Sequence, residues 1–145
     1  MPETSSGGTS WNDTVIEQFL AGKDRIADTF DRSSLLLLGT TGARSGQPRT
    51  SPLAYFTDGD RLVIVASAAG RDTHPSWYFN ILARPQVTIR RWDGDRLESF
   101  AALATPAEGA ERDRLFAEVA RVAPGFAEYQ ANTTRVLPVV ILHRV

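Results

Sequence analysis

The sequence contains no cysteine, and this absence excludes several kinds of chemistry. Without thiols the chain has no disulfide, no thiolate nucleophile, no zinc ribbon and no cysteine-ligated iron–sulfur cluster. Any redox chemistry therefore needs a bound cofactor. The lack of disulfides also agrees with a cytoplasmic location, which we expect for this chain.

Long hydrophobic runs and a strong net charge are missing as well. The apolar runs 35–38 and 138–142 are far too short to cross a bilayer, and the first ten residues have no apolar core, so we predict neither a membrane span nor a signal peptide. Residues 1–10 are polar and rich in glycine, serine and threonine, which predicts a disordered tail. A net charge of -1 gives no general attraction to nucleic acid, and we predict no such partner.

The chain does contain short apolar and alternating segments that are typical of strands. Asp-Gly-Asp turns at 58–60 and 93–95 each join two such segments into a β-hairpin. Because 145 residues fit one domain with one core, we assign residues 11–145 to a single domain. The six predicted strands cover residues 35–41, 50–57, 61–68, 86–92, 96–104 and 136–143.

Apolar residues at helical spacing predict helices between these strands. The first covers residues 12–30 with Asn12 or Asp13 as its N-cap, and the second begins at Pro75 and ends before Arg84. The third follows a capping box at 105–108 and buries Leu115, Phe116, Val119 and Val122, and a short helical segment follows Pro124. Hairpins with inserted helices predict an α+β fold built on a six-stranded antiparallel barrel.

The loop after the first predicted strand has the composition of an anion site. Residues 33–57 contain no acid, although 17 acids in 145 residues would put about three in a window of this length. The loop offers backbone N–H groups between Gly42 and Gly46, hydroxyls at positions 40, 41 and 45, and the guanidinium groups of Arg44 and Arg49. These groups bind phosphate or carboxylate. The alternative is a tight surface turn, which requires neither guanidinium groups nor an absence of acids.

Two motifs, TTGARSGQPRTSPL at 40–53 and THPSWYFNILARPQV at 73–87, resemble the deazaflavin-dependent nitroreductase family. This family is the branch of the flavin-like split β-barrels that uses coenzyme F-420 instead of FMN. The resemblance runs from about Leu35 to the C-terminus. It implies a six-stranded antiparallel split β-barrel with flanking helices. It also implies an oxidoreductase that transfers a hydride from reduced coenzyme F-420 to a small electron-poor acceptor: a quinone, a nitroaromatic or an activated enone.

The resemblance also implies which residues form the site. The loop after the first strand would hold the phosphate and the acidic glutamyl tail of the coenzyme, and residues 50–52 would run under its ring. The cofactor-binding positions are Thr41, Arg44, Ser45, Gly46, Arg49, Thr50, Ser51, Pro52, Ala66, Ser67, Ala68, His74 and Trp77. The acceptor pocket would consist of Trp77, Phe126 and Tyr129, and Ser67 and Tyr129 are the candidate catalytic residues.

Several of these residues have plainer interpretations. Ser67 alone is a polar residue at a strand end, Trp77 fits a core position, and His74 and His143 have no acid or cysteine at metal-ligand spacing, so no metal site is predicted. The family often has tyrosines at two positions that are Ala123 and Phe126 here, which leaves Tyr129 as the phenol of that segment.

Other functions stay open at this point. The same arginines can hold the phosphate of FMN in a sister oxidoreductase, and a non-catalytic protein can bind a deazaflavin or a lipophilic ligand without turnover. Contact of the N-terminal helix with a membrane surface and pairing into a homodimer through exposed strand edges are also open.

Overall fold

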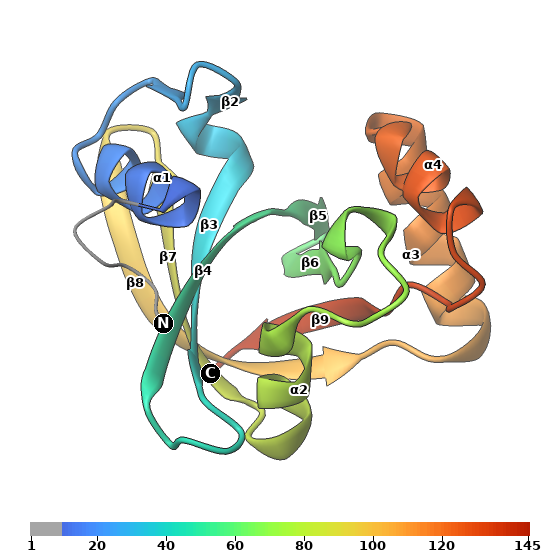
Figure 1. Ribbon diagram of the computed structural model, residues 1–145. Coiled ribbons are helices and arrows are strands. Elements are labelled where there is room, and N and C mark those ends of the chain that lie inside the picture. The colour runs from blue at the N-terminus through green and yellow to red at the C-terminus, as the bar shows by residue number, and fades with distance from the viewer. Residues whose placement is uncertain (1–9) are drawn as a thin grey trace.

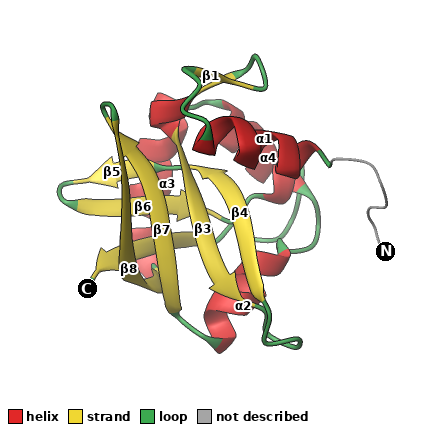
Figure 2. Cartoon of the chain, turned by 90° about the vertical axis from the view of Figure 1, so that its left-hand side faces the viewer, coloured by secondary structure: helices red, strands yellow, loops and turns green. Residues whose placement is uncertain are grey.

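Seven strands form one antiparallel sheet that curls into a half-barrel, with four α-helices around it (Figures 1 and 2). The computed structural model describes residues 10–145. The order across the sheet is β4-β3-β7-β8-β9-β6-β5. The strands are β3 (Leu35–Thr41), β4 (Pro48–Ala54), β5 (Phe56–Asp58), β6 (Arg61–Val65), β7 (Gln86–Asp93), β8 (Arg96–Pro106) and β9 (Val139–Arg144). The helices are α1 (Trp11–Leu20), α2 (Ser76–Ala83), α3 (Gly109–Val122) and α4 (Gly125–Ala131).

The leucine run that opens β3 is buried on both faces. Leu36 and Leu38 point into the half-barrel, where they join the main core, and Leu35 and Leu37 pack on the other face with Phe19 of α1. The same alternation holds in β6 and β9, whose outer faces pack against α3. Because side chains alternate along a strand, continuous apolar runs mark strands covered on both sides.

The half-barrel closes at Tyr55, and this corrects the predicted strand count. The sequence predicts one strand over residues 50–57, but β4 pairs with β3 and β5 pairs with β6, so the segment is split between the two opposite edges of the sheet. Tyr55 alone joins these edges. The sheet therefore has seven strands instead of six, while its antiparallel α+β character is confirmed.

The first helix is shorter than predicted. It ends at Leu20, Gly22 follows with φ of 76°, and the predicted second half is a two-stranded hairpin of β1 (Arg25–Ile26) and β2 (Phe30–Asp31). The side chain of Ser10, not of Asn12 or Asp13, caps the helix by accepting from the Asp13 N–H at 3.0 Å. Ser10 is thus part of the fold, and the rest of the predicted tail, residues 1–9, lies outside the described residues.

The predicted capping box is wrong. Thr105 belongs to β8, and α3 begins at Gly109 after Glu108, whose side chain makes no capping bond. The strand extends this far because β8 pairs with β7 along its first part and with β9 along its last. Leu115 and Val119 are buried as predicted, whereas Val122 is exposed.

The helices leave one side of β4 open for a site. In both views α1 lies at one end of β3 and β4, and α2 lies at the other (Figures 1 and 2). The last predicted strand is confirmed as central, because β9 pairs with β8 on one side and β6 on the other. Among the described residues, no helix combines the length and apolar character needed to cross a bilayer.

Candidate active site

Three adjoining hollows form a groove along β4. They measure about 660, 640 and 300 Å³ in order from the loop before β4 to the far end of that strand. The first two share Asn12 and Ser51, and the last two share Pro52 and Ser67, so they are continuous. We call them the anion end, the middle and the apolar end of the groove.

The anion end is built on a tight turn between β3 and β4. The Gly42 N–H donates to the carbonyl oxygen of Gln47 at 2.8 Å, and the Gly46 N–H donates to that of Gly42 at 3.0 Å. A Cβ at position 42 would displace the Ser45 hydroxyl, and Gly46 has φ of 68°, a backbone conformation that favours glycine. The N–H groups of Gly42 and Gly46, which we expected to bind an anion, are therefore already used inside the turn.

Asn80 of α2 holds this turn through two hydrogen bonds of its side-chain amide. Its Oδ1 accepts from the Ala43 N–H at 2.9 Å, and its Nδ2 donates to the Thr40 Oγ1 at 3.1 Å. Asn80 and Thr40 are only 7% and 5% exposed. Thr40 is therefore part of the support and not of the anion surface, contrary to expectation. Sequence reasoning assigned no role to Asn80, although it is a fixed position of the second motif.

The positive charge at the anion end is uncompensated. Arg44 and Arg49 are exposed and form no ion pair with any of residues 10–145. Arg49 reaches the Ser45 Oγ at 3.4 Å, and the N–H groups of Arg44 and Ser45 have no hydrogen-bond partner in the same part of the chain. Two free guanidinium groups beside two free amides favour a bound anion with several oxygens.

The middle of the groove lies between β4 and the segment 66–71, which we call the Ser67 strap. Ser67, Ala68, His74 and Trp77 line it opposite Pro52. Trp77 is 5% exposed, so most of its ring fills the core and one edge reaches the groove. Trp77 is therefore a core residue, as its position in the sequence suggested, and it also lines the groove.

His74 is held as a neutral ring. Its Nδ1 lies 2.9 Å from the Nη1 of Arg135, and because arginine can only donate, this nitrogen accepts and the proton sits on Nε2. Burial, with the nearby Arg135 charge, lowers the pKa of His74. The ring packs on Tyr78 at 4.7 Å between centroids.

The apolar end lies between α1 and α4. Trp11 and Val15 of α1 face Phe126 and Tyr129 of α4 across Leu53. Phe126 stacks edge-on against Tyr129, with centroids 5.6 Å apart. The Tyr129 hydroxyl makes no hydrogen bond within residues 10–145. This end fits a flat, apolar molecule that meets a few hydroxyl groups.

The groove brings together most, but not all, of the predicted site residues. Thr41, Gly46 and Ala66 are not among its lining residues, and Ala66 is fully buried. Those that do line it are Arg44, Ser45, Arg49, Thr50, Ser51, Pro52, Ser67, Ala68, His74, Trp77, Phe126 and Tyr129. Their binding and catalytic roles stay predictions.

Besides Asn80, sequence reasoning missed Trp11 and Arg135. Trp11 is 60% exposed and lines both the middle and the apolar end. Arg135 donates to three carbonyl oxygens of the Ser67 strap. No sequence pattern marks Trp11 or Arg135, because both lie far from the two motifs. In addition, arginines occur along the whole chain, so one more arginine does not stand out.

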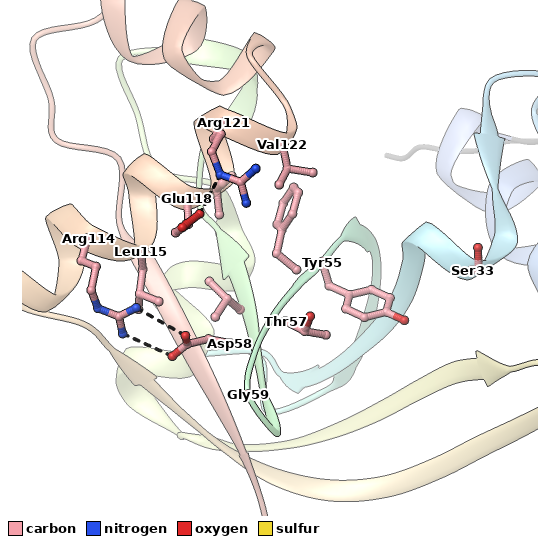
Figure 3. Close-up of a pocket in the computed structure, with 13 residues that line it drawn as sticks. Ser33, Tyr55, Thr57, Asp58, Gly59, Arg114, Leu115, Glu118, Arg121 and Val122 are labelled. Carbon is pink, nitrogen blue, oxygen red and sulfur yellow. Dashed lines mark hydrogen bonds and ion pairs between the residues drawn. The ribbon is translucent and has the colours of Figure 1, made fainter.

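A separate hollow of about 600 Å³ lies between β5 and α3 (Figure 3). Both arginines that line it are paired with acids, Arg114 with Asp58 and Arg121 with Glu118. Arg61, which does not line the hollow, also pairs with Asp58 and with Glu111. The hydrogen bonds from Arg114 and Arg61 lower the pKa of Asp58. We call this hollow the paired cleft.

Comparison with known proteins gives one consistent family. A family model described as F420H(2)-dependent quinone reductase matches residues 13–144. An F420H(2)-dependent quinone reductase of Mycobacterium tuberculosis is 41% identical over 112 residues, which cover 75% of this chain and 72% of that protein.

Two solved structures have the same fold. One is described as an F420-H2 dependent reductase, with 38% identity, a TM-score of 0.65 and coverage of 76% of this chain and 94% of the other. A second, described as a domain-swapped dimer, has 36% identity, a TM-score of 0.68 and coverage of 88% and 93%.

Proposed function

The chain belongs to the F420H(2)-dependent quinone reductase family, and we propose that it reduces a quinone at the apolar end of its groove with F420H(2), the reduced form of coenzyme F-420. The observation that carries this proposal is the polarity of the groove. Two arginines without an acidic partner among residues 10–145 stand at one end, and the other end is mainly apolar. A cofactor with an acidic tail and an apolar acceptor would occupy opposite ends.

The residues present at the anion end suit the coenzyme. Its phosphate and glutamyl carboxylates need several cationic and N–H donors. Within residues 10–145, Arg44 and Arg49 have no acidic partner, Arg49 makes one long bond to the Ser45 Oγ, and the amides of Arg44 and Ser45 have no partner. Hydrogen bonds to charged groups contribute about 1.5–3 kcal/mol each. The turn has its own support without a ligand, because Asn80 and the backbone bonds of Gly42 and Gly46 hold it.

The middle of the groove would hold the deazaflavin ring. When bound, the reduced ring supplies a hydride, so two electrons move together. Pro52 and the edge of Trp77 offer apolar surface, while Ser67 and Ala68 face the groove from the strap. These side chains orient the ring and exclude water from it.

The acceptor would lie between Trp11 and Phe126, next to the hydroxyls of Ser67 and Tyr129. Reduction of a quinone by a hydride also consumes one proton. Tyr129 and Ser67 can each hold a proton on their oxygen within this pocket, and we propose them as the groups that orient the quinone oxygen and pass that proton on from water.

Two partner predictions stay proposals. One relative forms a domain-swapped dimer, and β4 and β5 are edge strands of this sheet, so we propose homodimer formation, which light scattering of the purified protein measures. We also propose that the exposed Trp11 on α1 brings the groove to a membrane surface that carries the quinone, which vesicle sedimentation measures.

The first test is a titration with oxidised coenzyme F-420 and, in parallel, with FMN. Trp11 and Trp77 line the groove, so their fluorescence should report binding. We expect the protein to bind coenzyme F-420 but not FMN, and to reduce menadione with F420H(2). Preference for FMN would assign the protein to the flavin branch, binding without reduction of any quinone or nitroaromatic would make it a carrier, and binding of neither would overturn the site.

A further inference from the structure

We propose that Arg135 is a positioning residue for hydride transfer. It fixes the Ser67 strap so that the Ser67 hydroxyl and the backbone N–H groups of Ser67 and Ala68 face the coenzyme ring. This inference rests on the proposed function. It concerns a residue that does not line the groove and acts only through the strap.

The guanidinium group of Arg135 bonds to the Ser67 strap and to His74, three residues after the strap. Its Nη1 donates to the carbonyl oxygen of Ala66 at 3.0 Å, its Nη2 to that of Ser67 at 2.8 Å and its Nε to that of Arg71 at 2.9 Å. Nη1 also donates to the His74 Nδ1. One guanidinium group therefore ties both ends of the strap and the next turn into a single unit.

The strap needs such support because its backbone is strained. Ala68 and Ala69 have φ of 47° and 54°, and Gly70 has 79°, so three consecutive residues are in the left-handed region. Residues other than glycine adopt it only where surrounding contacts hold them there. On the other side, a Cβ at Gly70 would lie 2.9 Å from the Tyr129 carbonyl oxygen, so the strap is pressed against α4.

The backbone pattern sets the direction of the two N–H groups. The Ala66 N–H donates to Pro138, just before β9, and its carbonyl oxygen accepts from Arg135 on the same flank. In a planar trans peptide the next N–H points the opposite way. The Ser67 N–H therefore points toward the other flank, where β5 pairs only as far as Val63 and leaves the edge open.

The same reasoning applies to the next peptide. The Ser67 carbonyl oxygen faces Arg135, so the Ala68 N–H faces away from it. Neither N–H has a partner within residues 10–145, and both residues line the middle of the groove. Two fixed amide donors of this kind stabilise negative charge on a bound ring at no reorganisation cost.

The test compares Arg135→Lys and Arg135→Ala with Arg32→Ala. Arg32 is a matched control because it also donates to carbonyl oxygens, those of Gly22 and Gly94, but none of its hydrogen bonds reaches the Ser67 strap. The readouts are the absorption spectrum of bound oxidised coenzyme F-420, its dissociation constant, and the single-turnover rate of menadione reduction per bound coenzyme.

We expect the Arg135 variants to lower the single-turnover rate by about 10- to 100-fold, because misplacement of a reacting group by about 1 Å has effects of this size. The dissociation constant should change by less than about threefold, because Arg44 and Arg49 still hold the tail. The spectrum of the bound coenzyme should shift toward that of the free coenzyme. Added guanidinium ion should restore part of the rate in Arg135→Ala, and Arg32→Ala should change nothing.

Rates and spectra of the Arg135 variants equal to those of the parent would overturn the inference. So would an equal loss in Arg32→Ala, since the effect would then be general destabilisation. If Arg135→Ala does not fold, the result for Arg135→Lys tests the inference, because lysine keeps the positive charge and one donor nitrogen. Failure of the parent protein to bind coenzyme F-420 would instead contradict the proposed function.

Discussion

The anion end of the groove and the paired cleft both carry arginines in hollows of similar size, about 660 and 600 Å³. In the paired cleft, Arg114 is paired with Asp58 and Arg121 with Glu118 (Figure 3). At the anion end, Arg44 and Arg49 have no acidic partner among residues 10–145. The comparison teaches that charge balance, and not the number of arginines, marks a site for an acidic ligand.

The sequence around each hollow explains the difference. The segment 33–57 contains no acid, whereas the turn at 58–60 and α3 supply the acids that neutralise the paired cleft. Surface ion pairs contribute little to stability. Their main effect here is to remove attraction for anions from the paired cleft, which leaves the groove as the positive hollow.

The largest expected effect is on coenzyme affinity, when two arginines are removed from one hollow or from the other. Arg44→Ala with Arg49→Ala should weaken coenzyme F-420 binding by about 10- to 100-fold per arginine, since each charged contact contributes about 1.5–3 kcal/mol. Arg114→Ala with Arg121→Ala should leave affinity unchanged. Fluorescence titration measures both. A greater loss in the second pair would reverse the comparison.

The next effect should come from the support of the anion turn. Asn80→Ala leaves the Ala43 N–H and the buried Thr40 hydroxyl without partners, so we expect a loss of about 1–3 kcal/mol in the free energy of unfolding. Glu118→Ala, which removes an exposed pair in the paired cleft, should cost less than about 1 kcal/mol. Urea denaturation measures both, and equal losses would show that the turn is not anchored as described.

Ser67→Ala should separate chemistry from binding. We expect the single-turnover rate to fall by about 3- to 10-fold, as loss of one hydrogen bond allows, while the dissociation constant of coenzyme F-420 stays nearly constant. Ser33→Ala in the paired cleft is the matched control, because Ser33 lines that hollow. If affinity falls and the rate does not, Ser67 is a binding residue only.

The smallest expected effect concerns pH: His74 at the groove and Asp58 in the paired cleft should each reduce the stability of the protein, but over different pH ranges. The pKa of His74 is lowered from 6.5, so the unfolded chain binds more protons below that pH, and His74 opposes folding as the pH falls below 6.5. Asp58 has its pKa lowered from 3.8, so its contribution is full above 3.8 and is lost below it. Melting temperatures from pH 7.5 to 3 measure this.

Two variants assign these pH ranges. His74→Gln should flatten the melting temperature on the acid side of pH 6.5, and Asp58→Asn should flatten it only below about pH 4. A pH profile that His74→Gln leaves unchanged would show that another group carries the upper range.

Much of the fold could be predicted because its signals are local. The hairpins follow from alternation beside an Asp-Gly-Asp turn, and the double burial of β3 follows from its leucine run. The split of 50–57 at Tyr55 could not be predicted, because strand partners distant in sequence decide it. The capping box failed for the same reason, since pairing with β9 holds Thr105 in a strand.

The site divides in the same way. The absence of acids is a property of one short segment, so the sequence alone singles out Arg44 and Arg49 as candidates for anion binding. The anchoring of the turn by Asn80 and of the strap by Arg135 depends on contacts that span 37 or more positions in sequence. No local pattern announces such contacts, and the hydroxyl of Thr40 was assigned to the wrong surface as a result.

The position of β9 has a consequence for how the protein folds. It is the last strand in chain order, yet it lies between β8 and β6. Until it emerges from the ribosome, the chain can form two separate sheets, β4-β3-β7-β8 and β6-β5, connected through Tyr55. Docking of β9 is a long-range step, which makes it slow. Because β4 and the Ser67 strap belong to different pieces, the groove is complete only after β9 has docked.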